Sequence, residues 1–77
     1  MIQKYENWPI QPYNKFALAL AYFPDATNAT AATQRLYRWI KNNDTLTAKL
    51  AATGYHVRQH SFTSRQTGLI FEYLGEP

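Results

Sequence analysis

Residues 34–41 read Gln34-Arg35-Leu36-Tyr37-Arg38-Trp39-Ile40-Lys41, and this stretch decides the expected fold. Its apolar residues recur three and four positions apart, the spacing that places them on one face of an α-helix. Continued backwards, the pattern predicts a helix from Asn28 to about Lys41, with Thr27 as its N-cap. The residues expected to face the core are Ala32, Leu36, Trp39 and Ile40. The residues expected on the opposite side are Gln34, Arg35, Arg38, Lys41 and Asn42.

The segment just before this helix predicts another helix, from about Lys15 to Tyr22, with Asn14 as its N-cap. Pro24 ends it, because proline cannot continue a helix. The segment is apolar on nearly all sides, which indicates a central helix. The connection from Phe23 to Ala26 has a length that suits a helix-turn-helix.

Two further helices follow in the second half of the chain. Asn43 is the expected N-cap of the first, and Gly54 is its expected C-terminal stop. The second begins with a capping box, Thr63-Ser64-Arg65-Gln66, in which the Thr63 and Gln66 side chains bind each other's backbone. Gly75 ends it.

The remaining segments are expected to be extended. Residues 55–62 alternate imperfectly between two faces and predict a short strand or arm. Pro9 and Pro12 keep residues 1–12 out of helical geometry. The predicted fold is therefore mainly α: a small helix-turn-helix-like bundle of about four short helices with one or two short extended or β segments. We expect an extended N-terminal segment, 1–12, and a single helical domain, 13–77.

Composition narrows the classes of function. The chain has 77 residues, of which 45% are apolar, and this composition is too apolar for intrinsic disorder. It contains no cysteine, which excludes thiolate chemistry. No apolar run has the length of a membrane span or resembles a signal peptide, so a soluble cytoplasmic protein is expected. The three glycines are isolated and form no phosphate loop. We expect no enzymatic activity and no cofactor.

The histidines do not predict a catalytic or metal site. His60 and Ser61 are adjacent in the expected strand, so their side chains would point to opposite faces. That arrangement is poor for a nucleophile and its base. His56 and His60 would lie roughly 13 Å apart in a strand, too far to share one metal ion.

Positive charge is concentrated in the middle of the chain. Six of the eight basic residues fall between Arg35 and Arg65, with Asp44 as the only acid among them. This concentration favours duplex DNA as a partner, with the helix over 28–41 entering the major groove. The expected contacts to base edges are Asn28, Thr30, Thr33 and Gln34. The expected contacts to phosphates are Arg35, Arg38, Lys41, Arg58 and Arg65, with His60 beside Arg58 on a basic arm.

Three other interpretations fit the same pattern. The basic face is typical of any solvated helix surface. A protein-interaction module would use an exposed Tyr37 and the basic face to meet an acidic partner. Aromatic residues could instead stack on single-stranded nucleic acid, although a chain this short needs most of them for its core.

A set of short signatures covers residues 10–77. They are Tyr13-Asn14-Lys15, Leu18-Ala19, Tyr22-Phe23-Pro24-Asp25, Arg38-Trp39-Ile40, Gly54-Tyr55, Phe62-Thr63, Arg65-Gln66 and Glu72-Tyr73-Leu74-Gly75-Glu76-Pro77. In this combination the chain resembles a family of short bacterial proteins of unknown function, mainly from gut anaerobes, that commonly end in Tyr-Leu-Gly-Glu-Pro. The resemblance implies an intracellular bacterial setting and supplies no catalytic residue.

Overall fold

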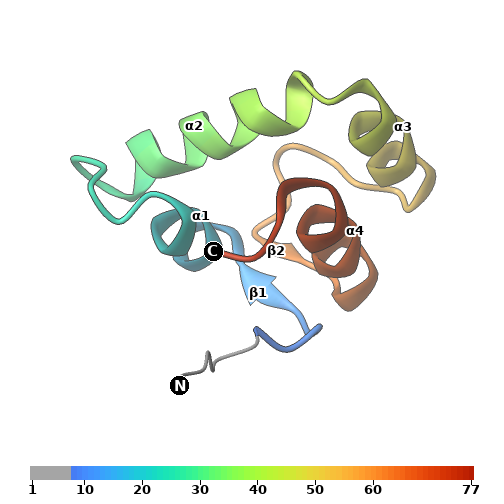
Figure 1. The fold of residues 1–77 in the computed structure, drawn as a ribbon, viewed down its shortest axis with the longest axis horizontal. Coiled ribbons are helices and arrows are strands. Elements are labelled where there is room, and N and C mark those ends of the chain that lie inside the picture. The colour runs from blue at the N-terminus through green and yellow to red at the C-terminus, as the bar shows by residue number, and fades with distance from the viewer. Residues whose placement is uncertain (1–7) are drawn as a thin grey trace.

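The computed structural model describes residues 8–77, which form four helices and one two-stranded sheet (Figure 1). In chain order the elements are β1 (Tyr13–Asn14), α1 (Lys15–Tyr22), α2 (Ala29–Lys41), α3 (Asp44–Ala52), β2 (Ser61–Phe62) and α4 (Ser64–Leu74). The predicted mainly α class is confirmed. Part of the expected extended segment, residues 1–7, lies outside the described residues.

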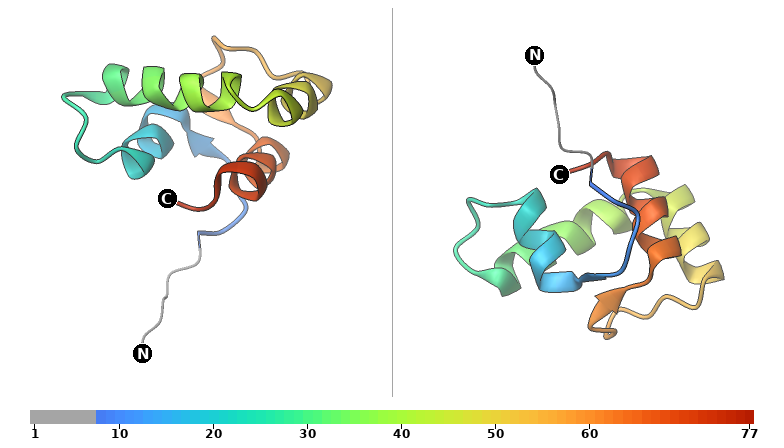
Figure 2. Two further views of the ribbon diagram at one scale, coloured as in Figure 1. Left: turned by 45° about the horizontal axis from the view of Figure 1, so that its top comes forward. Right: turned by 90° about the horizontal axis from the view of Figure 1, so that it is seen from below.

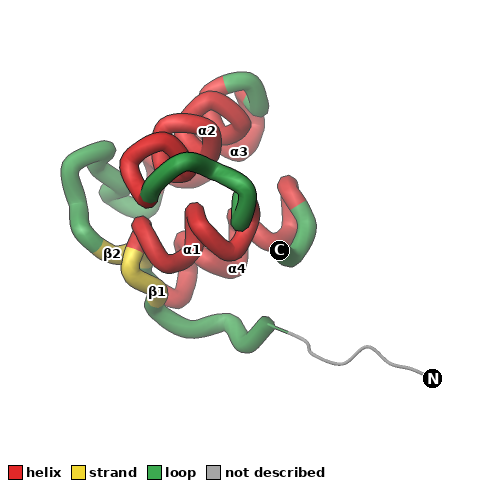
Figure 3. Tube along the Cα trace, turned by 90° about the vertical axis from the view of Figure 1, so that its left-hand side faces the viewer, coloured by secondary structure: helices red, strands yellow, loops and turns green. Residues whose placement is uncertain are grey.

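The helices lie in two layers. Helices α2 and α3 form one layer, α1 and α4 form the other, and the small sheet closes one side (Figures 2 and 3). The core draws on all four helices and on β2; its members are Leu18, Ala19, Phe23, Ala32, Leu36, Ile40, Leu46, Leu50, Phe62, Ile70 and Phe71. Because every helix buries part of one face, each depends on the others for its stability.

Three of the predicted helix starts are confirmed by hydrogen bonds. The Asn14 carboxamide oxygen accepts from the backbone N–H groups that begin α1, and Asn43 does the same for α3. At α4 both hydrogen bonds of the capping box between Thr63 and Gln66 are present. Gly54 follows the end of α3 with a φ of 85°, a conformation that favours glycine.

The predicted start of α2 is wrong by one residue. Asn28, not Thr27, is the N-cap: its side-chain oxygen accepts from Ala31 N at 2.9 Å. Asparagine is at least as good a cap as threonine, so local propensity did not favour Thr27. The α1–α2 connection therefore spans residues 23–28 and is longer than the predicted link.

Most of the predicted strand over 55–62 is irregular, with a turn at Val57 and Arg58. Only β2 pairs, antiparallel to β1, with Phe62 opposite Tyr13. Before it, His56 N donates to the Gln59 side chain at 2.9 Å, and Gln59 N donates to the His56 carbonyl oxygen at 3.0 Å. These bonds close a turn over residues 56–59, so this part of the segment is not extended and does not join the sheet.

Helix α1 is less central than predicted. Leu18 and Ala19 are fully buried, whereas Phe16 and Leu20 are each 37% exposed. The helix is covered mainly by α2, so its far side faces solvent although its sequence is apolar there. An apolar residue composition did not distinguish a helix buried all round from one buried on a single side.

The two ends of the described chain meet beside α1. The Tyr22 hydroxyl donates to the Gly75 carbonyl oxygen, and a Glu76 carboxylate oxygen accepts from Trp8 N at 3.2 Å. Burial, and secondarily the charge of Glu76, raise the pKa of the Tyr22 phenol. Tyr22 therefore stays protonated, and can keep donating, at an alkaline pH where an unperturbed tyrosine ionises.

Replacing Gly68 by alanine is expected to stabilise the protein by about 0.5–1 kcal/mol, because glycine inside a helix costs roughly that much relative to alanine. The added methyl group would lie 3.5 Å from Ile10 Cγ2, an ordinary contact. Thermal denaturation followed by circular dichroism checks this. Gly54→Ala is the control and should destabilise, since its φ is positive. A lower melting temperature for Gly68→Ala would contradict the prediction.

Candidate nucleic-acid interface

The outer face of α2 carries four of the ten predicted contact residues. Helical spacing directs Ala32, Leu36 and Ile40 into the core, where all three are buried. We call the exposed residues on the other side the outer face of α2; they are Thr30, Gln34, Arg38 and Lys41. The structure thus brings four of the predicted contact residues onto one side of a single helix.

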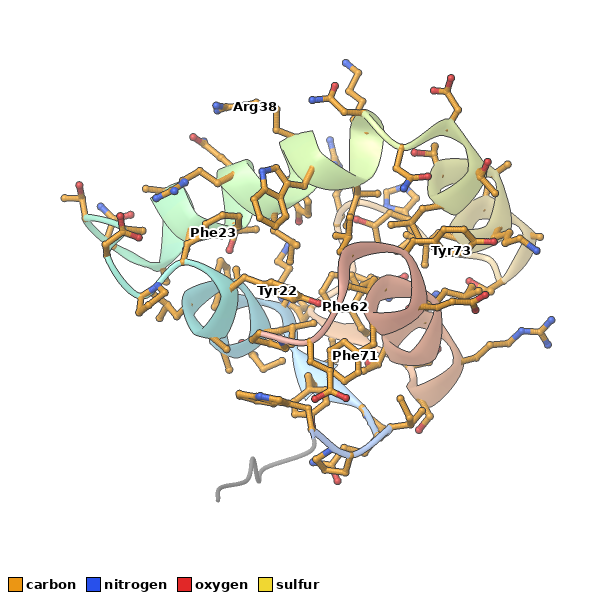
Figure 4. The ribbon with its side chains drawn as sticks, in the orientation of Figure 1. Tyr22, Phe23, Arg38, Phe62, Phe71 and Tyr73 are labelled. Carbon is orange, nitrogen blue, oxygen red and sulfur yellow. The ribbon has the colours of Figure 1, made fainter. Side chains whose placement is uncertain are left out.

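Arg38 and Lys41 lie in the last turn of α2. Figure 4 shows Arg38 extending from α2 away from the rest of the protein. The negative end of the helix dipole favours basic residues here, which is a stabilising role in itself. Within residues 8–77 the one ion pair joins Arg35 to Asp25, so neither Arg38 nor Lys41 has an acidic partner there. Their charges are available to an anion.

The loop before β2 lies beside α2. The Tyr37 hydroxyl donates to the Val57 carbonyl oxygen at 2.8 Å, which ties residues 56–60 to the helix. Arg58, the next residue, is exposed, and its backbone N–H donates to His56 Nδ1 at 3.1 Å. This contact brings the basic loop close to α2. It also half-buries Tyr37, so the expectation that this residue is exposed is wrong.

His60 and Arg65 lie further along the chain. His60 is exposed, and its carbonyl oxygen accepts from Lys15 N at 2.9 Å, beside the small sheet. Arg65 is exposed in the first turn of α4, which Figure 1 draws at the lower right while α2 runs along the top. Arg65 therefore does not share the outer face of α2. Residues 8–77 contain no group of three His, Asp or Glu side chains placed to hold a metal ion.

Arg35 is committed to neighbours in its own fold. Its guanidinium lies 3.5 Å from an Asp25 carboxylate oxygen and 4.3 Å from the centre of the Phe23 ring. It is half-exposed, so the ion pair is weak, but the aromatic contact also holds the side chain. The acid that offsets the charge of Arg35 therefore lies in the α1–α2 connection and not in α2 itself.

Two predicted base contacts have structural roles instead. Thr33 is 5% exposed, and its hydroxyl donates to the Ala29 carbonyl oxygen at 2.8 Å, so it is not a surface contact. Asn28 is exposed, but its side-chain oxygen caps α2 and is already occupied. Thr30 and Gln34 remain as polar side chains that are exposed on the first half of the helix.

The position of Trp39 differs from the prediction. It was expected in the core, yet it is 46% exposed. Its ring makes edge contacts with Phe23, at 4.8 Å between ring centres, and with Tyr22, at 6.4 Å. Trp39 lies at the edge of the apolar stripe of α2, and its exposure depends on how far α1 extends along α2. The sequence of α2 alone does not determine that exposure.

The family model described as a domain of unknown function, DUF4248, matches residues 9–77. No curated protein and no solved structure shows significant similarity to the chain. Within residues 8–77, no helix is both long enough and apolar enough to cross a membrane.

Proposed function

The protein belongs to the DUF4248 family, and because that family has no assigned function, we propose from its surface that it is a non-enzymatic nucleic-acid-binding module. The outer face of α2 would contact phosphates through Arg38 and Lys41, with Arg58 adding a third contact from the neighbouring loop. Each neutralised phosphate releases counterions, which makes such binding favourable and dependent on salt.

One observation carries this proposal. Arg38 and Lys41 are exposed on one helix face, unpaired among residues 8–77, and the Tyr37–Val57 hydrogen bond brings the Arg58 loop alongside. A basic surface without acidic neighbours has a positive potential that attracts polyanions. Arg35 contributes less, because it is paired with Asp25, and Arg65 lies on α4, outside the proposed contact surface.

Duplex DNA is the form that the sequence predicts. The exposed Thr30 and Gln34 side chains can donate and accept hydrogen bonds, as base edges require. They precede the basic residues along α2, an order that suits a helix whose first half enters a groove. The helix-turn-helix assignment remains a prediction and is part of this proposal.

The alternative, a protein-interaction module, depends on a different surface. Tyr37, the residue expected to meet a partner, is half-buried and bound to the Val57 carbonyl oxygen. This favours nucleic acid over an acidic protein as the partner of the basic face. We also propose a cytoplasmic setting in gut anaerobes, on the resemblance to short bacterial proteins and the absence of cysteine.

Replacing Arg38 and Lys41 together by alanine is expected to weaken binding to duplex DNA and reduce its salt dependence. Each phosphate contact contributes about −0.9 to the slope of log affinity against log salt, so the double variant should lose about 1.8 from that slope. Fluorescence anisotropy of a labelled duplex across a salt series measures both quantities.

The matched control removes the same amount of charge elsewhere. Lys49→Ala/Arg65→Ala changes two exposed basic residues on α3 and α4 and should leave the slope nearly unchanged. Equal effects of the two double variants would show only non-specific attraction to net charge. A wild-type protein whose binding does not respond to salt would rule out the proposed phosphate contacts.

A further inference from the structure

We propose that Trp39 is a stacking platform for an unpaired nucleobase, so that the preferred ligand is a nucleic acid with single-stranded segments. This inference rests on the proposed function, because it takes the phosphate contacts of Arg38 and Lys41 as given. It adds the substrate class and a residue that discriminates between paired and unpaired strands.

The exposed indole is held in place. Trp39 is 46% exposed, and its ring meets the Phe23 ring at an interplanar angle of 77° and the Tyr22 ring at 69°. Such edge contacts are favourable arrangements of aromatic rings and limit the motion of the indole. Figure 4 shows Tyr22 and Phe23 at the end of α1, beside α2. A ring fixed in this way loses little conformational entropy when a base stacks on it.

The charge around Trp39 is suited to a nucleic-acid strand. Arg38 precedes it on the same turn and is exposed without an acidic partner among residues 8–77. Arg35 lies one turn earlier, against Phe23, with Asp25 balancing its charge. The net positive charge nearest to the indole therefore comes from Arg38, about a quarter turn around the helix, whereas Lys41, two residues on, projects from the other side of α2. An aromatic ring beside basic side chains is the usual combination for binding single strands.

Duplex DNA offers no free base on which the exposed indole of Trp39 could stack. In a duplex, both faces of each base are already stacked on neighbours, so an exposed indole gains a partner only at an end or a disrupted step. An unpaired base offers a free π-face. Trp39 should therefore add affinity for a single strand and almost none for a duplex, while the phosphate contacts serve both.

A tryptophan reporter tests this directly. The chain contains two tryptophans, Trp8 and Trp39, so the Trp8→Phe variant leaves Trp39 as the only indole. Titration with an oligothymidine strand should quench its fluorescence, and a mixed-sequence duplex of equal length should quench it much less. In the same background, Trp39→Leu should weaken binding of the strand by roughly five- to a hundred-fold and leave binding of the duplex unchanged.

Further variants separate the possible outcomes. Trp39→Phe keeps an aromatic face and should recover part of the affinity lost in Trp39→Leu, and thermal melts confirm that both variants fold. If Trp39→Leu binds the strand as well as its parent while Arg38→Ala/Lys41→Ala does not, stacking is wrong and the proposed function stands. If no nucleic acid binds, both are wrong. Poly-glutamate that quenches Trp39 as strongly as the strand would overturn the inference in favour of an acidic protein partner.

Discussion

Replacing Phe62 by alanine is expected to lower the free energy of unfolding by about 3–5 kcal/mol, the usual cost of deleting a buried aromatic ring. Phe62 is 1% exposed and stacks on Tyr55, with 5.9 Å between ring centres and an interplanar angle of 16°. It also lies opposite Tyr13 in the two-stranded sheet, and Figure 4 shows it close to the centre of the protein. Its removal leaves a cavity at the point where helices and sheet meet.

For a domain of this size the loss would be severe. Total stability is typically about 0.05–0.15 kcal/mol per residue, or roughly 4–12 kcal/mol here. Urea denaturation followed by circular dichroism measures the change. Phe16→Ala is the matched control, since the same side chain is 37% exposed on α1 and should cost much less. Equal losses at the two positions would mean that Phe62 is not the core residue described above.

Replacing Gln66 by alanine is expected to cost about 2–3 kcal/mol, because three partly buried polar groups would lose their shared partner. Gln66 is 2% exposed. Its side-chain oxygen accepts from Thr63 N at 3.0 Å and from the Gln59 side chain, and its side-chain nitrogen donates to Thr53 Oγ1 at 2.9 Å. One side chain thus joins the start of α4, the end of α3 and the loop before β2.

The control for this variant is a glutamine without such contacts. Gln34→Ala makes the same chemical change on the outer face of α2 and should alter stability by less than about 0.5 kcal/mol. Both variants can be compared in the same urea denaturation experiment. A Gln66→Ala protein as stable as Gln34→Ala would show that the buried hydrogen bonds are replaced by others.

Local signals predicted the helices well. The caps of α1, α3 and α4 depend on a side chain and a backbone group two or three residues away, and sequence spacing contains that information. The predicted N-cap of α2, Thr27, differs from the observed N-cap, Asn28, by only one residue. The mainly α class follows from these elements, because four amphipathic helices in so short a chain have to bury their apolar faces against each other.

Long-range relations were not predictable in the same way. Trp39 lies at the edge of its apolar stripe, and its exposure depends on how far α1 extends along α2. Arg35 has a partner, Asp25, only because the connection over 23–28 turns back toward the helix. The strand over 55–62 is shortened by the hydrogen bonds of Gln59 to residues on both sides of it. Each outcome depends on a second segment whose position no local pattern specifies.

The contacts between the two ends of the described chain affect how quickly the protein can fold. Tyr22 and Gly75 are 53 residues apart, and Trp8 and Glu76 are 68 apart, yet each pair is joined by a hydrogen bond. Helical bundles usually fold fast because most of their contacts are local, whereas distant contacts require a large loop to close first. The β1–β2 ladder and the Tyr22–Gly75 contact both join segments that are far apart in the sequence. We therefore expect loop closure, more than helix formation, to limit the folding rate.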